Sequence, residues 1–296
     1  GCCGLTAADT RHLNDAAFAN LRELSFKGEG GFPDRVDASA LGRSPHLAGL
    51  ETLTLERVEL GDAGLAALAE GPGAANLRLL MIRENGITAK GIRALAGAAK
   101  FRTLRSLDLR KNPLGPDGAA ALAESPHLHG LRKVDIEQCD LGEEGMLALL
   151  RAPWMQKMVA FRFGWNKLTD RFAVELARQP FLANFINFDL GLNRIGDEGV
   201  IALANSPHLA GLRWLSVGSN RVGDAGCRAL AASPYLNNLE YLILTDNPGT
   251  TAAGRLPLWE RFHTGRCKFV FGGRQRVQDE RGDPEPQQSG AGFRDD

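Results

Sequence analysis

A stretch of 27 residues recurs along most of this chain, and this fixed period limits the possible folds more than any other feature. The stretch from Leu212 to Asn238 has the pattern L-x-x-L-x-V-x-x-N-x-V followed by a short Ala- and Leu-rich run, and the stretch that begins 27 residues earlier at Phe185 has the same pattern. Further copies begin at Leu50, Leu77, Leu104, Leu131, Met158 and Leu239. Similar units that each contact only their neighbours build an elongated solenoid with one continuous core.

Each unit is predicted to hold one strand and one helix. The fourth and sixth residues of a unit are apolar, as at Leu215 and Val217, so they face the core while the residues between them face the opposite, concave surface. A turn follows, and a helix then begins at pairs such as Gly61-Asp62, where the Asp is expected to cap its own helix. Prolines such as Pro207 are expected to end the helices.

We expect a single repeat domain over residues 1–272. Its first complete unit, from Leu21, is 29 residues long, and the Gly and Pro residues of Glu29–Pro33 predict a loop. Residues 1–20 align with the second half of a unit, so we expect the chain to be part of a longer protein, with a lipid anchor at Cys2 as the alternative reading. Residues 266–271 predict a closing strand, and the polar residues 273–296 predict a disordered tail.

Composition argues against several classes of function. The chain has 35 basic and 35 acidic residues, so its net charge favours neither nucleic acid nor an anionic membrane surface. No run approaches the roughly 18 apolar residues of a membrane span. The five scattered cysteines form no C-x-x-C or His/Cys cluster that would bind zinc. We therefore expect a cytoplasmic protein with no cofactor or metal, and with no nucleic acid or membrane partner.

The chain resembles the ribonuclease-inhibitor-like class of leucine-rich repeat proteins, and especially the tandem-repeat proteins of this type in bacteria. The apolar strand positions and the Asn of each unit carry the resemblance, which runs from Leu5 to Phe271. The resemblance implies an α/β solenoid, or horseshoe, with a parallel concave sheet and convex helices. It also implies a non-catalytic protein that binds another protein through its concave face, since members of this class act as enzyme inhibitors, ligand sensors or small-GTPase regulators.

Two recurring polar residues are interpreted as structural. An Asn follows the strand in most units, Cys139 takes its place once, and these side chains are expected to bond backbone groups at the end of the strand. The Asn positions are 85, 112, 166, 193, 220 and 247. His46, His127 and His208 occupy the same site in Ser-Pro-His-Leu, three units apart, which is too far to share a metal.

The concave face offers the candidate partner-binding residues, in two zones. The middle units present mixed charge at Asp108, Arg110 and Asp135. The later units present aromatic and aliphatic side chains with charged neighbours, above a floor opened by Gly164, Gly191 and Gly218, and this second zone consists of Arg162, Trp165, Asp189, Leu192, Trp214 and Tyr241. Aromatic anchors beside charges are enriched in protein interfaces, so we expect a protein partner here. The alternative is that Trp165 and Trp214 pack against one another as structural residues.

Other functions are possible in principle. Asp108 and Asp135 are expected about 5 Å apart on adjacent strands, where one carboxyl can hold a proton and act in acid–base catalysis, but the nearby Arg110 and Arg162 favour ion pairs. A regulator of a small GTPase, acting through an exposed Arg194 or Arg221, is the alternative to a plain scaffold.

Overall fold

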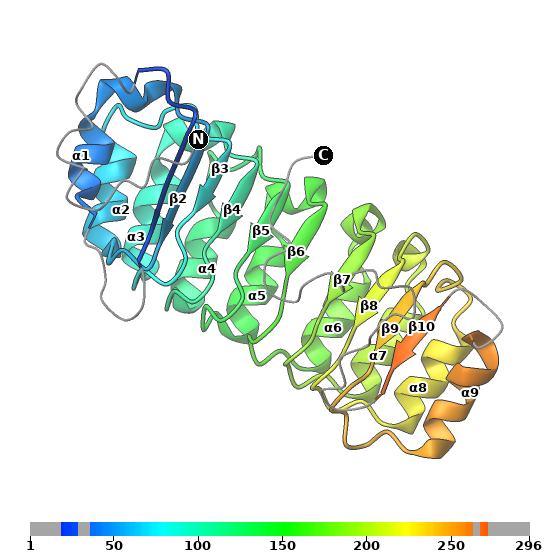
Figure 1. The fold of residues 1–296 in the computed structure, drawn as a ribbon. Helices are drawn as coiled ribbons and strands as arrows, with labels where there is room; N and C mark the ends of the chain where they lie inside the picture. Colours follow the sequence, from blue (N-terminus) through cyan, green and yellow to red (C-terminus); the bar gives the residue numbers. More distant parts are fainter. Residues whose placement is uncertain (1–18, 29–35, 263–266, 272–296) are drawn as a thin grey trace.

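One parallel sheet runs the length of the protein in the computed structural model, which describes residues 19–28, 36–262 and 267–271. Its ten strands lie in the order of the chain, so each pairs with the strands of the neighbouring units (Figure 1). They are β1 (Glu23–Lys27), β2 (Thr52–Glu56), β3 (Leu79–Met81), β4 (Ser106–Asp108), β5 (Lys133–Asp135), β6 (Ala160–Arg162), β7 (Asn187–Asp189), β8 (Trp214–Ser216), β9 (Tyr241–Ile243) and β10 (Lys268–Val270). The predicted solenoid is confirmed.

A helix follows each strand from β1 to β9 and lies behind the sheet, so the helices cover one face and leave the other open (Figure 1). They are α1 (Ala38–Arg43), α2 (Gly61–Glu70), α3 (Ala89–Gly97), α4 (Gly115–Ala123), α5 (Gly142–Leu150), α6 (Asp170–Ala177), α7 (Asp197–Ala204), α8 (Asp224–Ala232) and α9 (Ala252–Phe262). We call the helix-free side of the sheet the open face.

The prolines near the ends of the units do more than end the helices. Pro45, Pro153, Pro180 and Pro207 each begin a short 3-10 helix that leads into the next strand. Proline suits this first position because its fixed φ angle matches a helix and the N–H group that it lacks would have no partner there. These 3-10 helices are η3 (Pro45–Gly49), η5 (Pro153–Lys157), η6 (Pro180–Asn184) and η7 (Pro207–Leu209), and η4 (Ala99–Thr103) is the equivalent turn without proline.

The core lies between the sheet and the helices. Strand residues such as Leu80 and Leu107 and helix residues such as Leu95 are fully buried there, and each buried leucine contributes about 1.5–3 kcal/mol of transfer free energy. In the middle of the chain, phenylalanines replace the smaller residues. The ring of Phe163 lies 5.6 Å from that of Phe172 and 5.4 Å from that of Phe188.

The structural role predicted for the asparagines is confirmed. Asn85 is representative: its Oδ1 accepts hydrogen bonds from the backbone N–H groups of Val58 at 3.0 Å and Leu60 at 3.3 Å, and its Nδ2 donates to the backbone oxygen of Leu55 at 2.7 Å. Each such side chain therefore joins one unit to the preceding one, and supplies partners for backbone groups that would otherwise be buried without any.

The aspartates at the helix starts cap the next helix rather than their own, which corrects our expectation. Oδ1 of Asp170 accepts hydrogen bonds from the N–H groups of Gly196 at 2.6 Å and Gly199 at 2.8 Å, both at the start of α7. Asp62, Asp197 and Asp224 bond the start of the following helix in the same way. Asp170 is the first residue of α6 and does not precede the helix, so its side chain extends sideways to the start of the neighbouring helix, α7.

The solenoid is less regular on both sides of the unit that begins at Met158, and we call this region the seam: it includes the contact of α5 with α6 on one side of that unit and the contact of β6 with β7 on the other. β6 pairs with β7 at a single position, Arg162 with Asp189, whereas β5 pairs with β6 at three. α5 and α6 also pack less closely than the other neighbouring helices. Here a glutamate, Glu143, takes the place of the capping aspartate, and its longer side chain accepts hydrogen bonds from Thr169 N at 3.0 Å and Thr169 Oγ1 at 2.5 Å.

Several expectations lie outside the described residues. These are most of the partial unit at 1–20, with Cys2, the loop Glu29–Pro33, and the tail 273–296. Of the stretch 266–271 expected to close the sheet, the structure places β10 at Lys268–Val270, paired with β9. Within the described part of the chain, no helix is both long and apolar enough to cross a membrane.

Candidate interaction face

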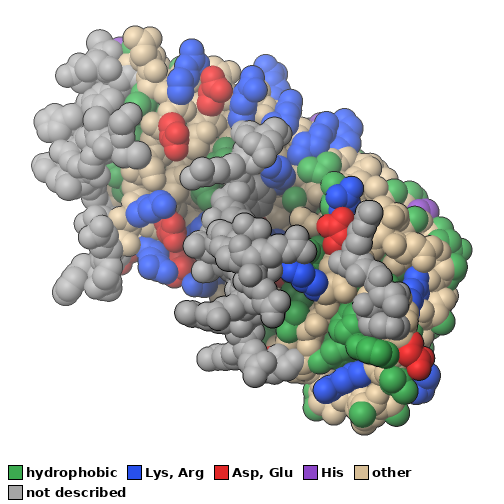
Figure 2. All heavy atoms as spheres, turned by 45° about the vertical axis from the view of Figure 1, so that its right-hand side comes forward, with side chains coloured by type: hydrophobic (Ala, Val, Ile, Leu, Met, Phe, Trp, Pro, Cys, Tyr) green, Lys and Arg blue, Asp and Glu red, His purple; other side chains and the backbone are tan. Residues whose placement is uncertain are grey.

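The open face carries one column of side chains that run across the strands, one from each strand. Strand pairing places Thr54 beside Met81, Met81 beside Asp108, and Asp108 beside Asp135. The column continues through Arg162, Asp189, Ser216 and Ile243. Mixed charges cover much of the N-terminal half of the molecule and hydrophobic side chains gather over the C-terminal half (Figure 2).

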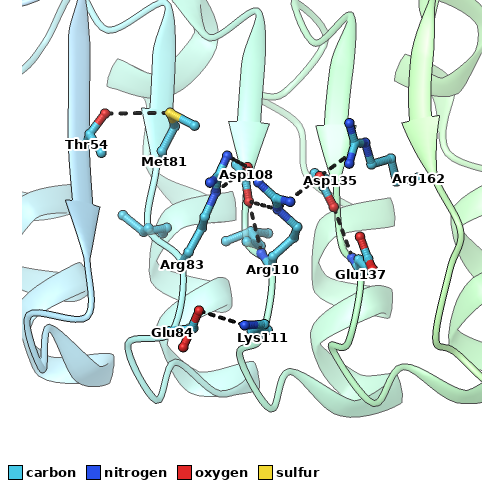
Figure 3. A network of polar contacts seen from close by, with 12 residues as sticks. Thr54, Met81, Arg83, Glu84, Asp108, Arg110, Lys111, Asp135, Glu137 and Arg162 are labelled. Atoms are coloured by element: carbon cyan, nitrogen blue, oxygen red, sulfur yellow. Dashed lines mark hydrogen bonds and ion pairs between the residues drawn. The ribbon is translucent and has the colours of Figure 1, made fainter. Parts of the chain in front are cut away.

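Asp108 forms the centre of an ion-pair cluster on β4. Its Oδ2 lies 2.6 Å from Nη2 of Arg83 and 3.2 Å from Nη2 of Arg110, and its Oδ1 accepts the backbone N–H of Arg110 at 3.2 Å (Figure 3). The carboxylate has no exposed surface. A charge buried this completely is tolerated because two guanidinium groups and a backbone N–H take the place of the water molecules that would otherwise solvate the carboxylate.

Asp135, the next residue in the column, shares Arg110 and adds Arg162. Its Oδ2 lies 3.1 Å from Nε of Arg110 and 3.5 Å from Nε of Arg162, but it accepts no hydrogen bond from either, because neither N–H points at it closely enough. Burial raises the pKa of Asp135 to about 7, aided by the charge of Asp108, while the two arginines lower it. Asp135 is thus the less well compensated of the two carboxylates.

The structure therefore changes the expected role of the middle zone. Asp108 and Asp135 were expected at the surface, but both are fully buried beneath the long side chains of the arginines. A partner that reaches this part of the sheet meets Arg83, Arg110 and Arg162 instead, of which Arg162 is the most exposed at 37%. The ion pairs expected for the two aspartates are confirmed.

A second ion cluster lies beyond the ends of the strands. Glu84 accepts a hydrogen bond from Nε of Arg57 at 3.0 Å. It also pairs with Nζ of Lys111 at 2.9 Å (Figure 3). The hydrogen bond from Arg57 is the largest of the contacts that lower the pKa of Glu84. The three side chains come from adjacent units, and the single carboxylate of Glu84 is shared by two cations at the rim of the open face.

Trp165 and Leu192 follow in the same row and form what we call the turn patch. Every residue of the row has a positive φ angle, between 51° and 58°: Arg57, Glu84, Lys111, Gln138, Trp165, Leu192, Ser219 and Asp246. The repeat pattern did not predict this conformation, which costs a residue other than glycine about 1 kcal/mol. It turns Trp165 and Leu192 outward, with exposed fractions of 47% and 42%.

Trp214 and Tyr241 form a separate strand patch. They are direct neighbours at the amino ends of β8 and β9, and Nζ of Lys268 lies 5.8 Å from the centre of the Tyr241 ring. About five residues along the strand direction, or roughly 16 Å, separate this patch from the turn patch. The single aromatic zone that we expected is therefore two patches, and Trp165 does not pack against Trp214.

Three glycines separate the two patches. Gly164, Gly191 and Gly218 occupy equivalent positions just beyond β6, β7 and β8. A Cβ atom built on Gly218 would lie 2.8 Å from Oγ1 of Thr245, and one on Gly164 would lie 3.4 Å from the Gly191 oxygen. The glycines therefore keep this strip of the face free of side chains, as the sequence predicted, and Arg162 and Asp189 lie beside it on the paired residues of β6 and β7.

Sequence reasoning left three residues out of the candidate contacts: Arg83 on the open face, and Val159 and Ile186 just before β6 and β7. Arg83 forms an ion pair with Asp108. Arg83 and Arg110 are both the seventh residue of their units, so the 27-residue period could have identified Arg83 as a second arginine near Asp108. Val159 and Ile186 are exposed by 44% and 56% at the second position of their units, where most other units carry a charge. That departure from the repeat was the available signal.

The remaining candidates lie apart from these patches. Arg194 and Arg221 are exposed in the turns before α7 and α8, and a GTPase-directed role for them stays a prediction. Cys139 is buried at the position of an Asn, and burial raises its thiol pKa to about 12, which leaves the thiol unreactive at neutral pH. No group of His, Cys, Asp and Glu side chains suited to a metal occurs among the described residues.

Comparison with known proteins identifies the repeat. A family model described as a leucine-rich repeat matches residues 102–123, 187–204 and 212–231. A search of curated proteins found no match. Among solved structures, the Rad7 and Elc1 complex in yeast is similar, with 15% identity, a TM-score of 0.50, and coverage of 86% of this chain and 55% of that chain.

Two further structures share the pattern more loosely. Internalin inlF from Listeria monocytogenes is 15% identical, with a TM-score of 0.44 and coverage of 91% of this chain and 94% of that chain. The TLR13–ssRNA13 complex is 18% identical, with a TM-score of 0.44 and coverage of 86% and 32%. This chain thus spans about half of the yeast protein chain and about a third of the TLR13 chain.

At these identities the likeness concerns the fold alone. The expectation that the chain binds no nucleic acid stays a prediction, as does a cytoplasmic location. The regular sheet, the asparagine that recurs after the strands and the matching family model agree on the architecture. The chain carries leucine-rich repeats and folds as a leucine-rich repeat solenoid.

Proposed function

We propose that this chain is a non-catalytic scaffold that binds a protein partner through the open face of its sheet. The observation that carries the proposal is the pair Trp165 and Leu192, which occupy left-handed turn positions and remain 47% and 42% exposed. Equivalent positions in the earlier units hold Arg57, Glu84 and Lys111. The fold therefore accepts polar side chains at this position, and an apolar pair exposed there has no role in the core.

The composition of the face suits a protein more than a small molecule. Two apolar patches with aromatic members lie on either side of a strip floored by glycine, with Arg162 and Asp189 between them. Interface centres are enriched in Trp, Tyr and Arg, and a separation of roughly 16 Å between the patches is wider than most small ligands. A partner segment that lies along the strip would contact both patches.

The buried ion pairs support this role by holding arginines in place. Asp108 and Asp135 fix the guanidinium groups of Arg83, Arg110 and Arg162 on the face. An arginine that is already ordered loses less side-chain entropy when a partner carboxylate binds it. We assign the two aspartates a positioning role, and Arg162, the most exposed of the three arginines, the direct contact.

We also propose that the protein belongs to the ribonuclease-inhibitor-like class and acts in a reducing compartment. The first proposal rests on the helix that follows each strand from β1 to β9, and the second on Cys139, Cys227 and Cys267, which are buried free thiols.

The test is affinity capture with matched variants of the full chain. The first variant is Trp165→Ala/Leu192→Ala in the turn patch, and the second is Trp214→Ala/Tyr241→Ala in the strand patch. The control is Ile201→Ala, which removes an exposed aliphatic side chain from α7 on the helix side. The proposal expects one protein to be retained by wild type and control and lost from both patch variants, all equally folded by circular dichroism. Equal recovery by all four proteins would contradict it.

A further inference from the structure

A second surface lies at the amino ends of the strands, formed by the second residue of each unit. We call it the strand-entry column, and its members are Arg22, Glu51, Arg78, Arg105, Arg132, Val159, Ile186, Arg213 and Glu240. Backbone hydrogen bonds stack them directly: the N–H of Arg105 donates to Arg78 O at 2.7 Å, that of Arg132 to Arg105 O at 2.8 Å, and that of Val159 to Arg132 O at 2.9 Å. From Arg78 to Val159, neighbouring members therefore lie about one strand spacing apart, roughly 4.8 Å.

Three consecutive arginines in this column carry more positive charge than the fold requires. Like charges on adjacent strands repel and destabilise a sheet, and the same position holds Glu51, Val159 and Ile186 in other units. The fold therefore tolerates an acidic or an apolar side chain there. A row of three positive charges at Arg78, Arg105 and Arg132 needs another cause.

The local contacts leave the arginines available. Arg78 is 3.8 Å from Glu51 through its Nε, and its side chain is mostly exposed. Nη1 of Arg105 donates to the backbone oxygen of Leu104 at 3.2 Å, and Nη1 of Arg132 donates to that of Leu131 at 3.2 Å. Within the described residues, neither Arg105 nor Arg132 forms an ion pair with a carboxylate. Their remaining N–H donors are free to bind an anion.

The column changes character abruptly after Arg132. Val159 and Ile186 follow directly, and Ile186 has the largest exposed fraction of the large hydrophobic side chains that the structure describes. An exposed aliphatic pair at the end of a basic row is unfavourable in water. Five consecutive members thus form one line that is basic over three strands and apolar over two.

We propose that the strand-entry column binds an extended acidic protein segment that continues into apolar residues, with its carboxylates on Arg78, Arg105 and Arg132 and its apolar side chains on Val159 and Ile186. From Arg78 to Val159 the column covers three strand spacings, roughly 14 Å, and Ile186 follows across the loosely paired contact of β6 with β7. An extended chain advances about 3.3–3.6 Å per residue, so about four residues reach from Arg78 to Val159, and a segment of about six continues to Ile186. Ile186 borders the strand patch, since the backbone N–H of Trp214 donates to Ile186 O at 3.1 Å, but the inference does not depend on either open-face patch.

Charge complementarity alone would also admit a nucleic acid. Single-stranded nucleic acids are held by basic grooves together with aromatic side chains on which their bases stack. The five members of the column between Arg78 and Ile186 include no aromatic residue, and a phosphate backbone would leave the two aliphatic side chains uncovered. An acidic segment with apolar residues at one end covers both parts of the line.

The experiment measures binding of a fluorescein-labelled peptide, Glu-Asp-Glu-Gly-Leu-Leu, to the full chain by fluorescence anisotropy. A peptide of the same composition with alternating order, Glu-Leu-Asp-Gly-Leu-Glu, is the matched control ligand. We expect the first peptide to bind at least about fivefold more tightly, because only its order matches the line of charges and aliphatic side chains. Equal affinity of the two peptides, or no saturable binding of the first, would overturn the proposal.

Protein variants locate the site. Arg105→Glu/Arg132→Glu is expected to weaken binding about tenfold or more at low ionic strength, and Val159→Ser/Ile186→Ser about threefold or more. The control Arg213→Glu alters the same column outside the five members, where Arg213 already lies 3.4 Å from Glu240, and is expected to leave the affinity unchanged. Circular dichroism verifies folding of each variant.

Two further results separate the explanations. A twelve-nucleotide oligo(dT) that binds more tightly than the peptide, and loses affinity in Arg105→Glu/Arg132→Glu, would overturn the proposal in favour of a nucleic-acid surface. The variant Trp165→Ala/Leu192→Ala is expected to keep the affinity for the peptide. Failure of the peptide assay therefore leaves the open-face proposal untouched, and failure of the capture experiment leaves this one untouched.

Discussion

Nε of Arg110 lies 3.1 Å from Oδ2 of Asp135, while the same arginine also reaches Asp108 through Nη2 at 3.2 Å. One guanidinium group thus serves two buried carboxylates on adjacent strands, and neither carboxylate has exposed surface. Asp108 gains a second close arginine at 2.6 Å, whereas the nearest nitrogen of the second arginine of Asp135 is 3.5 Å away. The burial of Asp135 is therefore less well compensated by its arginines, and its pKa rises to about 7.

The raised pKa of Asp135 predicts a pH-dependent stability. The folded protein holds this proton up to about pH 7, while the unfolded chain releases it near the ordinary value of 3.8. The free energy of unfolding should therefore fall as pH rises from about 4 to about 7, by at most about 1.4 kcal/mol per pH unit from this group. Urea denaturation at pH 5, 6, 7 and 8 measures the slope. Asp135→Asn should flatten it, and Asp189→Asn, from the same column, should not; an unchanged slope in Asp135→Asn would refute this assignment.

Removing Asp108 should be more damaging than removing any exposed acid. Asp108→Ala leaves Arg83 and Arg110 partly buried with less compensation, and breaking a buried pair in this way costs about 3–5 kcal/mol. Asp246→Ala, at the exposed end of a later unit, should cost under about 0.5 kcal/mol. The free energy of unfolding in urea is the measurement, and a loss below about 1 kcal/mol for Asp108→Ala would show that the arginines find other partners.

Glu143 should tolerate no shortening. It spans the wider junction between α5 and α6 to reach Thr169, so Glu143→Asp should lose both hydrogen bonds and cost about 1–2 kcal/mol, as much as Glu143→Ala. The comparison is Asp62, which reaches N and Oγ1 of Thr88 in the same way across a closer junction with a shorter side chain. Thermal denaturation compares the melting temperatures of Glu143→Asp and Glu143→Ala with that of the wild type. If Glu143→Asp melts at the wild-type temperature, α5 and α6 move closer together to restore the hydrogen bonds, and the prediction is wrong.

The seam should open locally before the rest of the solenoid. β6 and β7 pair at one position, and Oδ1 of Asn166 is buried with no hydrogen-bond donor among the described residues. Weakly paired backbone exchanges its amide hydrogens faster. Hydrogen exchange followed by mass spectrometry should therefore show faster exchange in peptides covering 159–166 than in those covering 105–112. Equal protection of the two regions would mean that the single strand pair suffices to hold the seam.

The sequence predicted the architecture well because the period specifies it. Apolar residues such as Leu215 and Val217 fix the strand, and the recurring Asn fixes the turn, so the columns of the open face follow from spacing alone. What the period does not specify is how far a side chain reaches. Asp108 and Asp135 were placed in the right column, but the pattern could not show that the long arginines fold over them and remove them from the surface.

The same limit applies to the apolar residues. Trp165 and Trp214 were both assigned to the later units, but their distance depends on the position along the strand, and this places them at opposite ends of the face. The direction of the aspartate caps also required the structure. An aspartate inside the first turn of a helix reaches either its own backbone or its neighbour, and only the spacing between the helices decides.

The most direct test of a protein-binding open face is site-specific photocrosslinking in the native lysate. A photoreactive phenylalanine analogue is placed at Leu192 in the turn patch, at Tyr241 in the strand patch, or at Ile201 on the helix side as the control. The account predicts that the positions of Leu192 and Tyr241 crosslink the same protein, identified by mass spectrometry, and that the position of Ile201 does not. Crosslinks of equal yield from all three positions, or from Ile201 alone, would contradict binding through the open face.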